Sequence, residues 1–310
     1  MDSLNRMALE LVEEAIDFTD ELGIEVRELD NEATLLDFGH HVPGGIEAGL
    51  LLAEIQTAGL ATVQTRMDTV AGAPLPHVEL TTDRPSLALL CSQTADWELS
   101  GHEFEGLGSG PARALAAEAE IFTRVGYADE FDFGVLAVES GEPPTPAIAA
   151  DIAERAGIEP SSLFLATVPT ASLAGSLTVA ARAAELATVR LTDLGYDPLD
   201  VRSVSASAPL APVSESEASA MGQTNDALAY GGQVHLTVAE EFDRFDELPS
   251  TAADEYGTPF ESIFASVDWS VADLPAELFA PAQLTVDVVG GSTHVLGETN
   301  DELLADSFDL

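Results

Sequence analysis

The sequence predicts an α/β protein of 310 residues, organised as two domains or as one large domain. Three observations predict this class. Amphipathic helical patterns alternate along the chain with short apolar runs rich in branched residues, as in open α/β sheets. Apolar residues make up 46% of the chain, which is enough for a substantial core. The alternation is not interrupted by an internal repeat or a low-complexity block.

The N-terminal half opens with a helix, because apolar residues from Leu4 to Leu22 recur at steps of three and four until Gly23. Turn-forming Asp30 and Asn31 then separate two short branched runs. The patterns that follow predict strands at 24–29, 33–38, 60–65, 77–82 and 133–139, and helices at 46–58, 85–95 and 111–124.

The C-terminal half begins after the linker-like stretch 139–146, which is rich in proline. We place a domain boundary there, with domains at 1–145 and 146–310, and allow that the N-terminal domain is discontinuous. The patterns predict helices at 146–156, 173–194 and 217–229, strands at 163–168, 201–205, 233–239 and 284–289, and a terminal turn at 301–306.

The charge balance indicates a salt-rich environment. The chain has no lysine, and its 11 basic residues, all arginine, face 55 acids, for a net charge of −44. Such a chain repels itself in dilute buffer, whereas in 1 M salt the Debye length falls to about 3 Å. We expect a salt-adapted cytoplasmic protein, because the single Cys91 excludes an internal disulfide and the acidic N-terminus is not typical of a targeting signal. The charge makes nucleic acid a poor partner, and no apolar run is long enough to span a membrane.

Arg182 and Glu185 are candidates for a catalytic pair. Residues 173–191 contain one acid in 19 positions, where the chain average of 55 in 310 would give about three. A helix with so little charge is expected to be buried on most sides, which places the pair in a core or a cleft. The alternative is a structural ion pair, which is the commoner origin of this spacing.

Glycine-marked junctions supply the other candidates. The turn of Gly108, Ser109 and Gly110 leads into a predicted helix that carries Arg113, an arrangement that can cradle an anion. The alternative is a tight turn that packs two elements closely. Two similar junctions lie near Glu47 and at residues 225–232, and for each taken alone an ordinary turn or helix cap is the favoured explanation.

Metal and nucleotide motifs are missing from the sequence. The six histidines form no H-x-H or H-x-x-x-H pair, and the chain has no G-x-S-x-G, Walker or dinucleotide-binding motif. We therefore predict no metal ion and no cofactor.

Eight segments, in order and spread over the whole chain, resemble the methenyltetrahydromethanopterin cyclohydrolase family. They are GGIEAGLL (44–51), TTDRPSLALL (81–90), GSGPARAL (108–115), VPTASLAGS with ARAAE (168–176 and 181–185), APLAPV (208–213), MGQTNDALAYGG (221–232), EYGTPF (255–260) and FAPAQ (279–283). The resemblance implies a hydrolase that opens the cyclic methenyl group of a reduced pterin to a formyl-pterin, without metal or nucleotide.

The same resemblance implies two α/β domains with mixed sheets, an active-site pocket between them, and a homotrimer. It implies that Arg182 and Glu185 carry the catalysis, in agreement with the charge argument. The matching segments also imply a set of substrate-binding residues: Glu47, Gly108, Ser109, Gly110, Arg113, Thr170, Ser172, Asn225, Asp226 and Tyr230.

The chain departs from the family pattern at four positions, where lysine or arginine is usual: Thr94, Gln223, Thr258 and Gln283. Fewer cations would weaken binding of the anionic end of a methanopterin. Two alternatives therefore stay open at this point: the same reaction on methenyltetrahydrofolate, and a pterin-binding protein without turnover.

Overall fold

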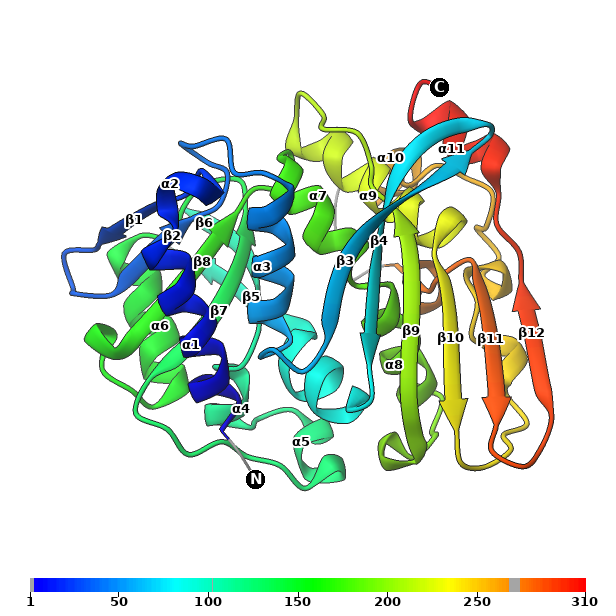
Figure 1. The fold of residues 1–310 in the computed structure, drawn as a ribbon, viewed down its shortest axis with the longest axis horizontal. Coiled ribbons are helices and arrows are strands. Elements are labelled where there is room, and N and C mark those ends of the chain that lie inside the picture. The colour runs from blue at the N-terminus through cyan, green and yellow to red at the C-terminus, as the bar shows by residue number, and fades with distance from the viewer. Residues whose placement is uncertain (1–2, 102, 268–273) are drawn as a thin grey trace. The chain divides into compact units, whose positions relative to one another are not determined.

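A computed structural model describes residues 3–101, 103–267 and 274–310 of the chain, which form two compact units. Unit 1 contains the chain up to Ala61 and again from Ser86 to Thr178, and unit 2 contains Thr62–Pro85 and Val179–Leu310. Each unit is built on its own six-stranded sheet with helices packed against it (Figure 1). The predicted α/β class, with two mixed sheets, is confirmed.

The units do not divide at residues 145 and 146. Residues 146–178 belong to unit 1, because the strand Leu163–Val168 pairs in parallel with two N-terminal strands. The hairpin formed by residues 62–82 belongs to unit 2, because its second strand pairs with Val201–Pro209. Both units are thus discontinuous, and the proline-rich stretch at 139–146 is a loop inside unit 1.

Unit 1 has the strand order β1-β2-β8-β7-β6-β5, in which β2, β8 and β7 run parallel and the other pairs are antiparallel. The strands are β1 (Glu25–Glu28), β2 (Thr34–Asp37), β5 (Ala95–Gly101), β6 (Phe104–Ser109), β7 (Gly134–Ser140) and β8 (Leu163–Val168). The helices are α1 (Leu4–Asp17), α2 (Thr19–Leu22), α3 (Ile46–Gln56), a π-helix (Ser86–Gln93), α4 (Arg113–Ala116), α5 (Glu120–Val125) and α6 (Pro146–Ala156). One apolar cluster joins α1 and α3 to the sheet, and a second joins α6 to it.

Three predictions in unit 1 were wrong in detail. Strands β5 and β6 were missed, since Gly101, Gly106 and Gly108 interrupt the apolar pattern between 95 and 109. The predicted helix at 111–124 is two short helices, because Ala117 adopts the left-handed conformation and ends α4. The helix predicted at 85–95 is present as a π-helix.

Unit 2 has the strand order β12-β11-β10-β9-β4-β3, in which only β10 and β11 run parallel. The strands are β3 (Thr62–Val70), β4 (Ala73–Thr82), β9 (Val201–Pro209), β10 (Gln233–Val238), β11 (Gln283–Val288) and β12 (Thr293–Gly297). The helices are α7 (Leu173–Ala180, shared with unit 1), α8 (Ala183–Asp193), α9 (Glu217–Gly231), α10 (Phe260–Ser266) and α11 (Asp301–Ser307). Helices α8 and α9 lie behind this sheet in Figure 1 and cover its apolar face. None of the helices in the described part combines the length and apolar character needed to cross a bilayer.

The helix predicted at 173–194 is broken between α7 and α8. The Thr178 hydroxyl donates to the Gly175 carbonyl at 2.9 Å, and the Arg182 N–H bonds back to Val179 in a tighter turn. Hydroxyl bonds of this kind compete with the helical ladder and bend helices. As a result, α8 begins at Ala183 and Glu185 lies in its first turn.

Candidate functional site

Arg182 and Glu185 form an ion pair at the start of α8. The Arg182 Nε donates to Glu185 Oε2 at 3.0 Å. The Glu185 side chain is only 2% exposed, while that of Arg182 is 17% exposed. Most of the neighbouring α8 residues are buried as well, so the burial inferred from the lack of charge is confirmed.

The groups around Glu185 have opposite effects on the charged form of its carboxylate. Burial disfavours the charged form of a carboxylate, whereas the guanidinium of Arg182 and the positive N-terminal end of α8 favour it. A buried carboxylate held beside an arginine is a candidate for a general base and acid.

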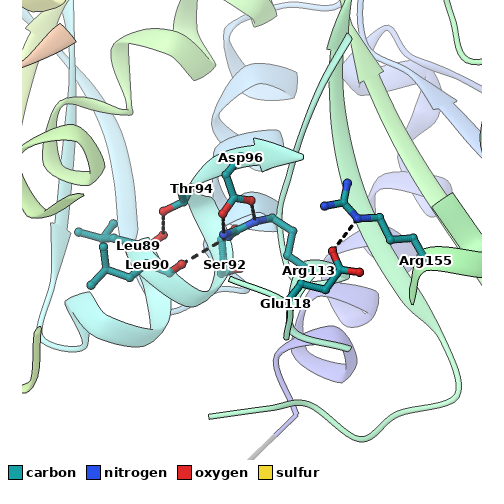
Figure 2. Close-up of polar contacts among 8 residues, drawn as sticks. All are labelled: Leu89, Leu90, Ser92, Thr94, Asp96, Arg113, Glu118 and Arg155. Carbon is teal, nitrogen blue, oxygen red and sulfur yellow. Dashed lines mark hydrogen bonds and ion pairs between the residues drawn. The ribbon is translucent and has the colours of Figure 1, made fainter. Parts of the chain in front are cut away.

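Arg113 is engaged inside unit 1 and has a structural role. Its side chain is 0% exposed, and its Nε and Nη2 both bond to the Asp96 carboxylate, as Figure 2 shows. Its Nη1 donates to the carbonyls of Leu90 and Ser92, at the end of the π-helix. The guanidinium therefore does not present its charge to a ligand, and the anion-cradle interpretation of this junction is not supported.

The glycine turn before Arg113 is the end of strand β6, where close packing explains the glycines. A Cβ at Gly108 would come within 3.1 Å of Leu136 and Trp97 side-chain atoms. Gly110 has a φ of 116°, in the range that favours glycine, and its N–H already donates to the Ser92 carbonyl at 2.8 Å. The Ser109 hydroxyl accepts from Gln56 Nε2 at 2.9 Å.

Thr170 and Ser172 lie in the loop after β8, at the carboxyl end of the parallel strands. The Thr170 hydroxyl donates to Glu139 Oε1, in β7, at 2.5 Å. Ser172 accepts from the Gly175 N–H at 3.0 Å and caps the start of α7. Open α/β sheets bind ligands at this edge, so the structure places the pair Thr170–Glu139 where a ligand contact is expected.

Sequence reasoning missed a second cluster at the same edge, after β2. Buried Asp37 accepts from the N–H groups of Gly39, His40 and His41, and His40 Nε2 lies 2.9 Å from the Thr167 hydroxyl. Burial raises the pKa of Asp37, but these hydrogen bonds outweigh it and hold the pKa below its usual value. The available signal was the position of polar residues directly after predicted strands 33–38 and 163–168.

The predicted residues of α9 are bonded within unit 2. Asn225 donates to the Met221 carbonyl at 2.8 Å, and the Tyr230 hydroxyl donates to the Thr258 carbonyl at 2.6 Å. Asp226 is buried and accepts from the Ser307 hydroxyl at 2.6 Å and from the Phe260 N–H at 2.9 Å. These bonds tie α9 to α10 and α11.

Burial raises the pKa of Asp226 to about 6 and that of Tyr230 to about 12. Glu47 is exposed in the first turn of α3. Across residues 3–101, 103–267 and 274–310, no three His, Cys, Asp or Glu side chains converge to hold a metal ion.

A comparison with family models matches residues 3–308 to the cyclohydrolase (MCH) family. The match covers almost the whole chain. This protein belongs to that family.

Curated relatives agree with this membership. The chain is 56% identical over 310 residues to the methenyltetrahydromethanopterin cyclohydrolase of Halobacterium salinarum, covering 100% of both chains. It is 36% identical over 312 residues to the protein of that name from Methanospirillum hungatei, covering 99% of each. It is 34% identical over 317 residues to that from Methanococcoides burtonii, covering 100% of this chain and 99% of the relative.

At three of the four departures from the cyclohydrolase pattern, a neutral side chain bonds to neighbouring groups, and at the fourth a backbone carbonyl does. Gln223 accepts from the Ser214 hydroxyl at 2.5 Å and donates to the Ser307 carbonyl at 2.8 Å. Gln283 accepts from Gln233 at 3.3 Å, and the Thr94 hydroxyl caps the π-helix at the Leu89 carbonyl (Figure 2). Thr258 contributes the carbonyl that Tyr230 contacts.

Proposed function

We propose that this protein is a methenyltetrahydromethanopterin cyclohydrolase, which hydrolyses the methenyl bridge of the pterin to give a formyl-pterin. The observation that carries the proposal is the buried Glu185 carboxylate beside Arg182, in a chain whose family and curated relatives carry this activity in their names. The names of these relatives favour the methanopterin substrate over the folate alternative.

The substrate explains why so few groups suffice. Its bridging carbon lies between two nitrogens as an amidinium cation, so it is already electrophilic and needs no Lewis acid. We therefore propose that the reaction uses no metal ion and no cofactor.

Glu185 acts first as a base. It takes a proton from water as the water oxygen bonds to the bridging carbon and neutralises the amidinium. Arg182 holds the Glu185 carboxylate in position through the 3.0 Å bond, and its positive charge stabilises oxygen charge during the addition.

Glu185 then acts as an acid. It returns its proton to one nitrogen as the C–N bond breaks, and the hydroxyl proton of the adduct leaves as the formyl C=O forms. The balance is one water consumed and one proton released for each cationic bridge opened.

The finer parts of the proposal are a cytoplasmic, salt-adapted homotrimer. The net charge of −44 supports the salt adaptation, and it argues against nucleic acid as a partner. Light scattering during size-exclusion chromatography in molar potassium chloride measures the oligomeric state directly, and a monomer would contradict the homotrimer.

The test is the decay of methenyl-pterin absorbance in molar potassium chloride, with the methanopterin and folate forms side by side. We expect decay with the methanopterin form, and loss of most of that decay in Glu185→Gln. The matched control is Glu247→Gln, which removes the carboxylate of an exposed Arg-x-x-Glu pair and leaves turnover unchanged. Full activity of Glu185→Gln would contradict the role of Glu185, and binding without decay would indicate a pterin-binding protein.

A further inference from the structure

The sheet of unit 2 has one open face. In each strand, alternate residues lie on the side of α8 and α9, and the others lie on the opposite side, which faces the viewer in Figure 1. All the outward residues of one row are exposed or partly exposed, whereas their neighbours Val63, Leu80 and Val234 are buried on the helical side. Strand pairing aligns that row across the whole sheet as Thr62, Thr81, Ser205, His235, Thr285 and Val295. Neither the candidate site nor the proposed reaction uses this face.

Acids are missing from the exposed positions of this sheet. Roughly two in five of the exposed residues in the described chain are acidic. In the six strands of unit 2, all of which the structure describes, no exposed residue is an acid. In the sheet of unit 1, by contrast, five of the seven exposed strand residues are acids, namely Glu25, Glu28, Asp96, Glu98 and Glu105. The low frequency of acids in strands therefore does not explain the difference, because the same chain places acids on its other sheet.

The three partly exposed acids of the unit 2 strands are bonded to neighbouring side chains. Asp68 and Glu79 both pair with Arg66, and Asp287 accepts from the Thr293 hydroxyl at 2.8 Å. The open face therefore presents mainly hydroxyl, amide and imidazole groups, which donate as well as accept hydrogen bonds.

We propose that this open face is the surface through which copies of the chain meet, a proposal that rests on the homotrimer of the proposed function. Around a symmetry axis each side chain lies near its own copies, so an acid there would face identical acids. A chain with a net charge of −44 therefore associates with itself at least cost through a surface without exposed acids. A different protein could bring basic residues to meet acids, so such a partner would not require their absence.

The size and chemistry of the face suit a contact between copies. Six strands spaced by about 4.8 Å, with about 20 Å of length each, give roughly 600 Å². That area approaches the about 800 Å² that each partner contributes to a standard interface. Because the side chains both donate and accept, the same face on another copy supplies matching partners. Val295, which is 69% exposed, adds apolar contact at the β12 edge.

The first test adds one acid to the centre of the face. Ser205→Glu should raise the subunit dissociation constant about tenfold or more, because like charges then meet at the contact. Light scattering during size-exclusion chromatography in about 2 M potassium chloride measures the assembly. The matched controls are Ser205→Gln, of the same size without the charge, and Ser262→Glu, at an exposed position of α10. Equal stability of the assembly in Ser205→Glu and both controls would overturn the proposal.

The second test measures protection of the face directly. The single Cys91 is buried, so Ser205→Cys introduces the one exposed thiol. In molar potassium chloride we expect iodoacetamide to label it about tenfold more slowly than Ser262→Cys, since the other copies cover it. Equal labelling rates would overturn the proposal even if the protein is a trimer. A monomeric wild type would overturn it together with the homotrimer, while decay of methenyl-pterin absorbance in the same preparation would still support the proposed reaction.

Discussion

The chain contains the pattern Arg-x-x-Glu at two places in unit 2, and the two pairs differ in their exposure to solvent. At the start of α8, Glu185 is 2% exposed and Arg182 17% exposed. In the loop after β10, Arg244 and Glu247 are 45% and 42% exposed, and two bonds of 2.7 Å join them. Spacing and geometry are thus similar, while solvent access is not.

The difference teaches that the neighbouring residues, and not the motif, indicate which pair is placed for chemistry. Residues 173–191 contain a single acid, whereas residues 240–247 contain five acids in eight positions. An ion pair among many charges on a surface is screened and contributes little. A pair in an uncharged helix is shielded from water, so its charges act strongly on whatever lies next to them.

The largest expected effect separates the two arginines. Arg182→Met should lower kcat roughly 10²–10³-fold, the usual cost of removing a donor that stabilises developing oxygen charge. Arg244→Met should leave kcat unchanged, because its pair lies in solvent. Steady-state turnover in molar potassium chloride measures both variants, and equal losses would remove the distinction drawn here.

The next effect tests whether burial alone makes an arginine catalytic. Arg113→Met leaves the Asp96 carboxylate and two carbonyls without their donor, so we expect a loss of about 3 kcal/mol in the free energy of unfolding. Denaturant unfolding at constant salt measures it. Turnover per folded molecule should fall far less than in Arg182→Met, and a comparable fall would place Arg113 in the chemistry after all.

Asp226 extends the comparison to a buried carboxylate bonded only to neutral donors. Because its pKa is raised from 3.8 to about 6, the native state binds more protons than the unfolded state between these values. Stability contributed by this group is therefore present below pH 4 and is lost as the pH rises through 6, by about 3 kcal/mol at most.

Asp226→Asn keeps the shape but cannot titrate; its amide oxygen still accepts from the Phe260 N–H, and its NH2 group donates to the Ser307 oxygen instead of accepting from it. We expect the stability of Asp226→Asn to increase relative to that of the wild type as the pH rises from 4 to 7. Denaturant midpoints of both proteins at each pH measure this difference. Parallel curves for the two proteins would show that Asp226 is ionised throughout.

The smallest effect belongs to the exposed pair Arg155–Glu118, drawn beside Arg113 in Figure 2. Glu118→Gln should cost about 0–1 kcal/mol, since the pair is screened by solvent and salt. Arg155 also lies over the Trp97 ring at 4.3 Å, so Arg155→Ala should cost more than Glu118→Gln. Equal costs would assign the contribution of Arg155 to charge pairing alone.

Much of the fold could be predicted from local patterns. Helix α6 begins at Pro146 and strand β8 spans 163–168 as predicted, because a capped amphipathic helix and a buried branched run are strong signals. Glycine-rich strands β5 and β6 carry no such signal, and they are held in the sheet by the pairing of β6 with β7 and of β5 with β6. The bounds of the two compact units could not be predicted for the same reason, since they depend on which distant strands pair.

The candidate site shows a similar division. Burial of Glu185 was predictable because one acid in 19 positions is a property of the sequence itself. The role of Arg113 was not, because Asp96 and the end of the π-helix meet it only through tertiary structure. From the sequence alone, an isolated charged residue near glycines looks the same whether its side chain faces a ligand or a carboxylate of the same unit.

The separation of β4 from β9 in the sequence has a consequence for synthesis on the ribosome. Thr82 pairs with Val204, 122 positions later, so the β3–β4 hairpin emerges about 6–24 s before its neighbour at ordinary elongation rates. During that interval its open edge is a template for pairing with other nascent chains. Pro74 and Pro76 lack N–H groups, and Asp68 and Glu79 add charge. Both features make the hairpin a poor template for pairing with other chains until β9 is synthesised.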